Sequence, residues 1–136
     1  MAGTRHKART IALQALYEAD CATHDAEAVV ERLLAETDLT EENNNFAVEL
    51  VRGVLQNKDE IDQNIQRFAP AWPVNQIAII DRNILRLAIF EILFDNKVPV
   101  KVAVSEAVEL AKTFGSQNSA KFVNGVLGTV STLASQ

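Results

Sequence analysis

The sequence predicts an all-α protein, and three observations support this prediction. Apolar residues recur at the i, i+3, i+4 spacing of a helix in one segment after another. No segment shows the alternation of apolar and polar residues that is typical of a half-buried strand. Pro70 and Pro73 interrupt the helical pattern and indicate a joint between two halves. The 136 residues suit one domain that buries about two thirds of its unfolded surface.

The most apolar segment, residues 75–95, is expected to form one central helix. It contains no Gly or Pro, and its apolar residues lie on nearly every side of a helix rather than on one stripe. Such a helix must be covered by neighbours on several sides. The segment is too short and too charged to span a bilayer, because it contains Asp81, Arg82, Arg86 and Glu91. These four residues are the exceptions that need an explanation.

The first helix is expected over residues 4–22, with Thr4 as its N-cap. Three cations, Arg5, Lys7 and Arg9, lie in its first turns, where the helix dipole favours carboxylates instead. A conflict of this kind with a local rule is expected at functional sites. A solvated, frayed basic N-terminus explains the pattern equally well. The expected buried face of this helix consists of Ala8, Ile11, Ala12, Ala15, Leu16 and Ala19.

Three further helices are expected before the proline pair. The second covers residues 26–37, and the third follows Asp38 and Glu41, which are spaced as in a capping box. Gly53, inside the third helix, suggests a close crossing with another helix. The fourth covers residues 58–68. The expected apolar face of the third helix consists of Phe46, Ala47, Leu50, Val51, Val54 and Leu55.

Two helices are expected after the central one. The sixth begins near Pro99 and stops at Gly115, and the seventh follows the polar turn 116–119. Gly125 and Gly128 lie inside the seventh helix and suggest that another backbone approaches it closely. The expected buried residues of the sixth helix are Val104, Ala107, Val108 and Ala111. Those of the seventh are Val123, Val126, Leu127 and Val130, with Phe122 at the margin.

Composition argues against several classes of protein. The single cysteine, Cys21, excludes an internal disulfide framework and fits a reducing cytoplasm. The N-terminus lacks the apolar stretch of a secretory signal. Only two histidines, His6 and His24, are present, and Cys21 with His24 would supply only two ligands for zinc. No phosphate-binding glycine loop or nucleophile elbow occurs, so we expect no enzyme, metal or cofactor.

The distribution of charge favours binding of one polyanion at one place. The net charge is −5, yet the first nine residues hold three cations and no acid. Cations can contact phosphate, Gln14 can bond a base edge, and Tyr17 can stack on a base, which together suit single-stranded RNA. Tyr17 could equally be an ordinary residue at the edge of a bundle. Arg86 could extend this surface or instead pair with Asp81, Asp62 or another acid, and pairing is slightly favoured.

Three stretches then resemble the NusB family of bacterial transcription antitermination factors, in family order and spacing. They are RHKARTIALQALY at 5–17, DRNILRLAIFE at 81–91, and PVKVAVSEAVELAK at 99–112 followed by SAKFVNGVL at 119–127. The resemblance implies two small helical bundles packed into one domain over residues 1–136, the first about 1–70 and the second about 74–136. It implies candidate RNA-binding residues Arg5, His6, Lys7, Arg9, Gln14, Tyr17, Arg86, Asn118 and Lys121, and candidate partner-binding residues Asp81 and Phe122.

The resemblance also implies partners. It implies a non-enzymatic protein that pairs with NusE, a small-subunit ribosomal protein, to bind boxA in nascent RNA. That pair joins NusA, NusG and RNA polymerase to suppress termination, notably in ribosomal RNA operons. The chain departs from the family by holding His6 and Lys7 where arginines are usual, and Asn118 where an acid is common. The first departure weakens the basic patch, and the second eases the approach of RNA.

Two other interpretations remain at this point. A NusB-like domain also precedes the catalytic domain of certain ribosomal RNA cytosine methyltransferases, although this chain contains no cofactor-binding domain. A helical interaction module without an RNA role is the third interpretation. The sequence leaves open whether a homodimer hides the RNA-binding face.

Overall fold

The computed structural model describes the backbone of residues 2–134 and the side chains of residues 5–132. Within those residues every regular element is helical, which confirms the all-α prediction. The chain divides into two compact units, residues 1–56 and residues 57–136. No helix in the described part of the chain combines the length and apolar content of a membrane span.

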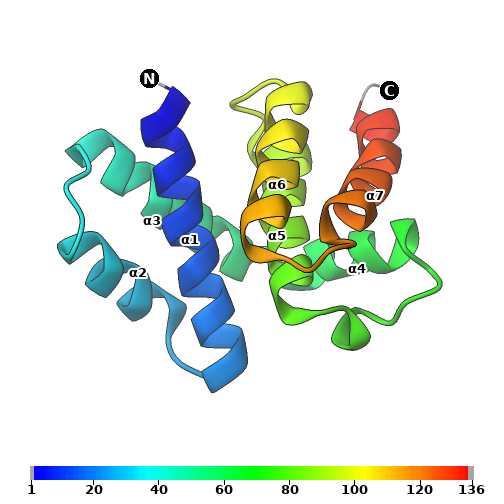
Figure 1. Cartoon of the computed structure of the whole chain (residues 1–136), viewed down its shortest axis with the longest axis horizontal. Coiled ribbons are helices and arrows are strands. Elements are labelled where there is room, and N and C mark those ends of the chain that lie inside the picture. The colour runs from blue at the N-terminus through cyan, green and yellow to red at the C-terminus, as the bar shows by residue number, and fades with distance from the viewer. Residues whose placement is uncertain (1, 135–136) are drawn as a thin grey trace. The chain divides into compact units, whose positions relative to one another are not determined.

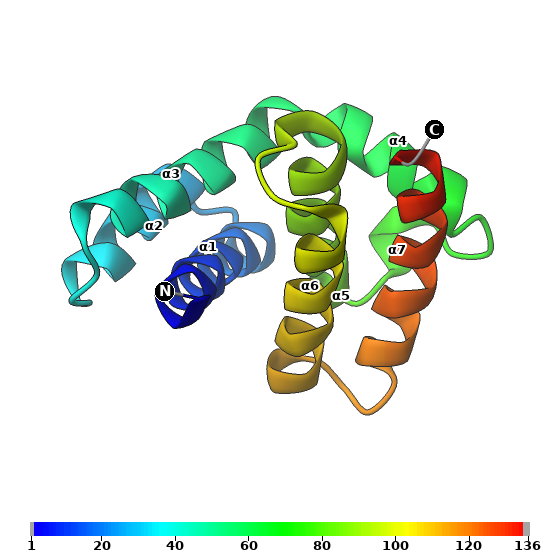
Figure 2. The same cartoon turned by 90° about the horizontal axis from the view of Figure 1, so that it is seen from above.

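The first unit consists of three helices that pack pairwise against one another (Figures 1 and 2): α1 (Ala2–Ala22), α2 (Ala26–Ala35) and α3 (Glu41–Gln56). The helix α1 extends beyond the predicted start, so Thr4 lies inside it rather than at its cap. Asp25 caps α2 by accepting a hydrogen bond from the backbone N–H of Glu27. The N-terminal cap of α3 is provided by Thr40, whose hydroxyl accepts from the N–H of Asn43, and not by the predicted Asp38.

An ion pair joins α1 to α2 within this unit. Arg32 donates to Glu18 at 2.7 Å, and His24 lies 3.2 Å from the same carboxylate. The hydrogen bond from Arg32, and secondarily the one from His24, lowers the pKa of Glu18. The carboxylate therefore stays charged through the neutral range and helps to hold the exposed end of α1 against α2.

The second unit contains α4 (Lys58–Phe68), α5 (Ile79–Ile89), α6 (Val100–Phe114) and α7 (Ser119–Ala134), with two short elements, η1 (Val74–Gln76) and η2 (Phe90–Asp95). The helices α6 and α7 lie side by side in both views, and α5 packs against α4, α6 and α7 (Figures 1 and 2). Residues 83–92 are all buried, which confirms that the central apolar segment is covered on several sides.

The single central helix predicted over residues 75–95 is instead interrupted twice. Ile77 and Ala78 are extended, with ψ near 139° and 137°, so that η1 ends before α5 begins. The interruption allows Ile77, outside any helix, to be buried in the core. From Phe90 the backbone widens into a π-helix, which ends where Asn96 adopts a left-handed conformation. Apolar periodicity alone does not distinguish these local changes from a continuous helix.

The boundary between the units also differs from the expectation. Residues 57–68 belong to the second unit, although the proline pair placed the joint near residue 70. The side chains that fix α4 there are Ile61 and Ile65, both fully buried, and Asp62, which pairs with Arg86 of α5. Prolines end α4, but tertiary packing decides with which helices it associates.

Two further local predictions were wrong, one of them in part. A Cβ atom built on Gly125 or Gly128 would meet no atom within 4 Å, so neither glycine is required for a close helix approach. The buried face of α6 is only partly the predicted one. Ala107 and Ala111 are buried as expected, Val104 and Val108 are half-buried instead, and Ala103 and Leu110 complete the core. The predicted core of α7 is confirmed, since Val123, Val126, Leu127 and Val130 are all buried.

Candidate nucleic-acid and partner interface

The three N-terminal cations occupy very different environments. Lys7 is exposed, Arg5 is half-buried, and Arg9 is only 3% exposed. The guanidinium carbons of Arg5 and Arg9 lie 4.2 and 5.1 Å from the ring centroid of Phe46 on α3, within the range of a cation–π interaction. A buried guanidinium cannot reach a phosphate, so we infer a structural role for Arg9 in place of the RNA contact predicted for it.

Two residues of α3, Glu42 and Phe46, contact the guanidinium of Arg5. Its Nη2 donates to Glu42 at 3.2 Å, and its Nη1 is buried without a hydrogen-bond acceptor among the described residues. Glu42 itself is exposed, so this ion pair is open to competition from another anion. Phe46, which was predicted to be a core residue, is half-buried and orients both arginines. The position of Phe46 on the apolar face of the third helix did not predict this role.

An exposed stripe runs along α1. Lys7, Gln14 and Tyr17 are exposed and follow one another at seven and then three residues, a spacing that keeps them on one face. The stripe from Lys7 to Tyr17 is about 15 Å long at the helical rise of 1.5 Å per residue. Near its start, Lys7 and Thr10 line a shallow pocket of about 320 Å³ with residues 37–39. His6 is half-buried, and its carbonyl accepts a hydrogen bond from Thr10.

Tyr17 is available for stacking. The residue is 41% exposed, and a hydrogen bond with Cys21 raises the pKa of its hydroxyl. The phenol therefore remains neutral in the physiological range and adds no negative charge to the stripe. A neutral aromatic beside an amide and a cation has the chemistry that stacking on a base requires.

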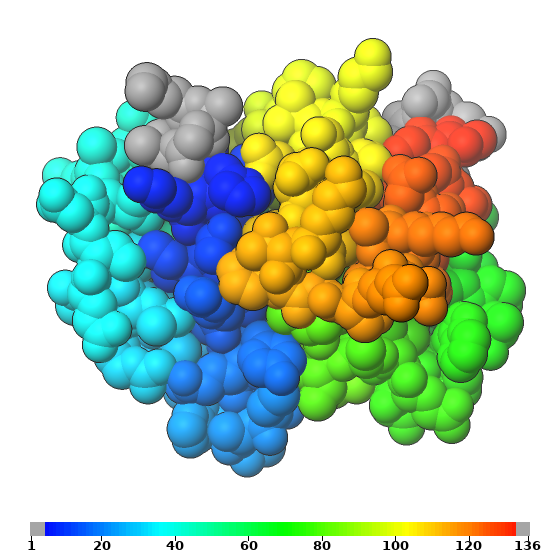
Figure 3. Space-filling model, viewed as in Figure 1, coloured from blue at the N-terminus to red at the C-terminus, as the bar shows by residue number. Residues whose placement is uncertain are grey.

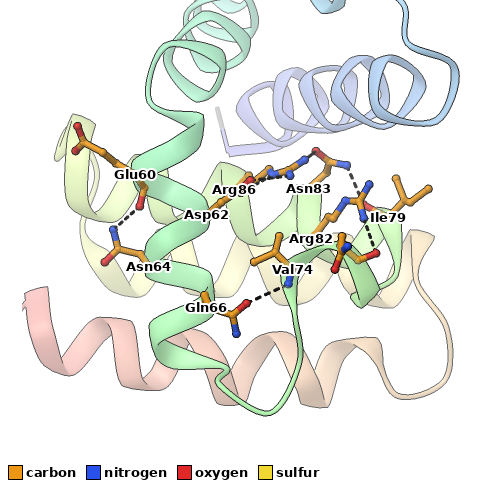
Figure 4. Close-up of polar contacts among 10 residues, drawn as sticks. Glu60, Asp62, Asn64, Gln66, Val74, Ile79, Arg82, Asn83 and Arg86 are labelled. Atoms are coloured by element: carbon orange, nitrogen blue, oxygen red, sulfur yellow. Dashed lines mark hydrogen bonds and ion pairs between the residues drawn. The ribbon is translucent and has the colours of Figure 1, made fainter.

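In the second unit, Arg86 is a buried structural residue. Figure 4 shows it pointing toward Asp62 of α4, and the two side chains form a bidentate pair, Nε to Oδ1 at 2.8 Å and Nη2 to Oδ2 at 3.0 Å. A third bond joins Arg86 to the amide oxygen of Asn83 at 3.1 Å. Arg86 is 5% exposed, so the predicted pairing with Asp62 is confirmed, and its burial leaves no surface for RNA.

The remaining predicted residues lie close together. Asp81, Asn118 and Phe122 line one pocket of about 250 Å³, together with Trp72, Gln76, Ile77, Ala78 and Ser116. Phe122 is half-buried at the margin of the α7 core, while Asn118 and Lys121 are exposed. The turn that carries Asn118 and the start of α7 (orange) are at the visible surface in Figure 3. Trp72, which also lines this pocket, was not among the predicted residues, because its neighbours Pro70 and Pro73 indicated only a loop.

The turn between α6 and α7 is fixed locally. Ser119, only 1% exposed, accepts a hydrogen bond from the backbone N–H of Ser116 at 2.8 Å through its hydroxyl. A Cβ on Gly115 would lie 2.4 Å from that side chain, so only glycine fits before the turn. This packing holds Asn118 at the rim of the pocket.

The sequence model of the NusB family matches residues 6–132. The chain belongs to the NusB family. The transcription antitermination protein NusB of Dehalococcoides mccartyi strain 195 is 59% identical over 131 residues, which cover 96% of this chain and 92% of that protein. The NusB protein of Chloroflexus aggregans is 46% identical over 134 residues.

Solved NusB structures have the same fold. The T. maritima NusB structure matches with a TM-score of 0.88 and 36% identity, covering 94% of this chain and 90% of that one. A chain in the crystal structure of the antitermination factors NusB and NusE in complex with dsRNA matches with a TM-score of 0.89 and 25% identity. That match covers 98% of this chain and 99% of the other. These comparisons confirm the predicted family and fold class.

The environment of Arg86 predicts a loss of stability without a loss of RNA binding. We expect Arg86→Ala to lower the free energy of unfolding by about 3 kcal/mol, because Asp62 keeps its charge in a partly buried place. The affinity of the folded protein for RNA should not change. Urea unfolding measures the first quantity and fluorescence anisotropy with labelled RNA the second.

The matched control is Arg67→Ala, which removes an exposed arginine from α4 and should cost less than about 1 kcal/mol. A double variant, Arg86→Met with Asp62→Leu, should recover most of the lost stability, because it removes both charges from the core. A clear drop in RNA affinity with unchanged stability would contradict the structural role.

The ion pair between Glu42 and Arg5 predicts that removing the Glu42 carboxylate strengthens RNA binding. We expect Glu42→Gln to strengthen RNA binding at low salt by about twofold to fivefold, because Arg5 no longer has a competing carboxylate. The control, Glu41→Gln, removes an exposed charge from the same helical turn but releases no cation. Equal effects of the two variants would show that only net charge matters.

Proposed function

We propose that this chain is a transcription antitermination factor that pairs with NusE and, with it, binds boxA in nascent ribosomal RNA. The observation that carries the proposal is membership of the NusB family together with the fold shared with NusB in its complex with NusE and dsRNA. The named relatives are antitermination proteins that the chain matches over most of their length, which favours this function over a methyltransferase domain or an RNA-independent module.

The α1 stripe supplies the chemistry for RNA. Lys7 and Arg5 contact phosphates, while Gln14 and Tyr17 face the bases. His6 is adjacent to Arg5 and Lys7 in sequence. In the second unit, Asn118 and Lys121 are the exposed candidates for polar contacts with RNA. Arg9 acts indirectly, because it shares the ring of Phe46 with Arg5. The number of exposed cations on this stripe is small for a chain of net charge −5, so the affinity for RNA alone is low.

NusE then supplies the contacts that this chain lacks. Asp81 and Phe122 are the candidate residues for the partner, and they line one pocket. In this proposal the pair of proteins joins NusA, NusG and RNA polymerase in the cytoplasm, and no catalytic step is involved. The test is RNA binding measured with and without NusE at one salt concentration. Tighter binding in the presence of NusE is expected, and equal affinities would contradict the pairing.

The salt dependence of RNA binding separates the three N-terminal cations. We expect Arg5→Ala and Lys7→Ala each to reduce the log–log slope of affinity against salt by about 0.7, the value for one phosphate contact on a single strand. Arg9→Leu should leave the slope unchanged, because Arg9 is buried. Filter binding from about 50 to 300 mM salt measures the slopes.

Lys101→Ala, which removes an exposed lysine from α6, is the control and should not alter the slope. The assignment fails if the Arg9 variant loses as much slope as the Lys7 variant while remaining folded.

Substitution of Phe122 by a charged residue should affect partner binding, whereas the same substitution of its neighbour Val123 should affect folding. We expect Phe122→Asp to retain the helical fold and its thermal transition but to weaken NusE binding by about 1–2 kcal/mol, since Phe122 is half-buried beside the pocket. Val123→Asp, one residue further, should unfold the unit because Val123 is fully buried. Circular dichroism and calorimetric titration with NusE provide both readouts. Unfolding of both variants would place Phe122 in the core.

A further inference from the structure

A groove runs between α6 and α7 within the second unit. Figures 1 and 2 show the two helices side by side, and Figure 3 shows both at the visible surface. The groove has a volume of about 460 Å³ and shares no lining residue with the pocket at Asp81. Most of its lining comes from α6, and α7 contributes Asn124 and Ser131.

Two valines in this groove are left partly in contact with water. Val104 and Val108 lie one turn apart on α6, at the spacing of core residues, and both line the groove. The structure leaves both half-buried, because the core face of α6 is turned toward smaller residues such as Ala107 and Ala111. A surface that covered the two valines would gain free energy from removing their apolar atoms from water.

Gly128 keeps the α7 side of the groove low. Residues three and four apart are neighbours on a helix, so Gly128 lies between Asn124 and Ser131 on the face that lines the groove. A Cβ built on Gly128 would meet no atom within 4 Å, so packing inside the unit does not require glycine here. Glycine weakens the interior of a helix relative to alanine, but it allows another backbone to approach closely. The position therefore suits a helix from outside the chain.

The charges along the groove favour carboxylates. Lys101 lies in the first turn of α6, which contains no acidic residue, so its charge adds to the positive end of the helix dipole. No carboxylate among residues 5–132 pairs with Lys101. Further along α6, Lys112 lies 3.6 Å from Glu109, and both side chains are exposed, so another carboxylate can compete for Lys112.

The lining suits a protein better than RNA. No aromatic side chain on which a base could stack is among the described residues that line the groove, and Glu109 would repel a phosphate. Half-buried valines flanked by lysines instead complement an amphipathic helix whose apolar stripe is bordered by acids. Lys101 and Lys112 are about three helical turns apart, or roughly 16 Å at 1.5 Å per residue, so a helix of similar length reaches both.

We propose that the groove between α6 and α7 binds an amphipathic, acidic helix of a protein partner. Aliphatic side chains of that helix cover Val104 and Val108, its backbone passes close to Gly128, and its carboxylates meet Lys101 and Lys112. The site is additional to the proposed function, because neither the α1 stripe nor the pocket at Asp81 contributes to it.

Titration of the full-length, ¹⁵N-labelled chain with two capped peptides tests the proposal. The first, acetyl-SPELAELAAELAELA-amide, has a leucine stripe bordered by glutamates, and the second, acetyl-SPQLAQLAAQLAQLA-amide, replaces each glutamate by glutamine. We expect the first peptide to produce saturable shifts of the backbone amide resonances of groove residues on α6 and α7. Binding of the second should be about threefold weaker, the effect of losing exposed ion pairs.

A variant that fills the groove should separate stability from binding. We expect Gly128→Leu to raise the temperature of the thermal transition, because leucine favours the helix and the site is open. The same side chain stands where the partner's backbone passes, so the affinity for the glutamate peptide should fall by at least about tenfold. The control, Thr129→Leu, adds leucine at an exposed position turned by about 100° around α7 and should leave the affinity unchanged.

A second pair of variants tests the charges. Lys101→Gln should reduce the preference for the glutamate peptide, whereas Lys58→Gln, which removes an exposed lysine from α4, should retain it. If a variant does not fold, the comparison of the two peptides on the unaltered chain still decides. Equal binding of both peptides, no saturable shift with either, or unchanged binding by a folded Gly128→Leu variant would overturn the proposal.

The other occupants are outcomes of the same experiment. Shifts of the groove resonances with a short oligouridylate, but with neither peptide, would assign the groove to RNA and overturn the proposal. Shifts of these resonances on dilution of the chain alone would assign it to a second copy, with the same consequence. The peptide titration uses neither NusE nor boxA, so the proposed function can fail while this inference holds, and the reverse.

Discussion

The second unit depends on the complete burial of α5. A helix with apolar residues on nearly all sides is covered by α4, α6 and α7, so each polar group along it must be satisfied from within the unit. Arg86 meets this requirement through Asp62 and Asn83, and Asn83 donates in turn to the carbonyl of Ile79. The pair also explains why α4 belongs to this unit. Asp81 is the contrasting case, because one of its buried oxygens has no donor among the residues that the structure describes.

In the first unit, Phe46 stabilises the cations at the start of α1. Cations in the first turns of a helix oppose its dipole. The ring of Phe46 lies beneath the guanidinium groups of Arg5 and Arg9, and Glu42 adds a carboxylate, so the unfavourable placement is offset by α3. The placement of cations in the first turns of α1 therefore has two explanations. Arg9 is part of the packing, whereas Lys7 and the outer side of Arg5 are accessible to an anion.

The elements that periodicity determines were predictable, and those that depend on tertiary contacts were not. Spacing and turn chemistry predict the helices α1, α2, α3, α4, α6 and α7, the capping turn before α7 and the core stripe of Val123, Leu127 and Val130. The break at Ile77, the π-helix after Ile89 and the assignment of α4 depend on packing between segments distant in sequence. For the site, the sequence placed Gln14 and Tyr17 on one strip of the first helix, and the structure adds Lys7 to it. The sequence could not distinguish buried from exposed arginines, because both have the same local pattern.

The two candidate surfaces have opposite chemical preferences, and this difference bears on how the chain works in the proposed function. The stripe on α1 presents a cation, an amide and a neutral aromatic, which suit a polyanion with exposed bases. The pocket at Asp81 combines an acidic residue with two aromatic residues, and no lysine or arginine is among the residues that line it. On a chain of net charge −5, a strong general affinity for RNA would require many more exposed cations. A basic protein partner held at an acidic pocket would supply that positive charge. On this proposal the low affinity of the isolated chain for RNA is the reason that antitermination depends on the partner, because only the assembled pair carries enough positive charge to retain the RNA.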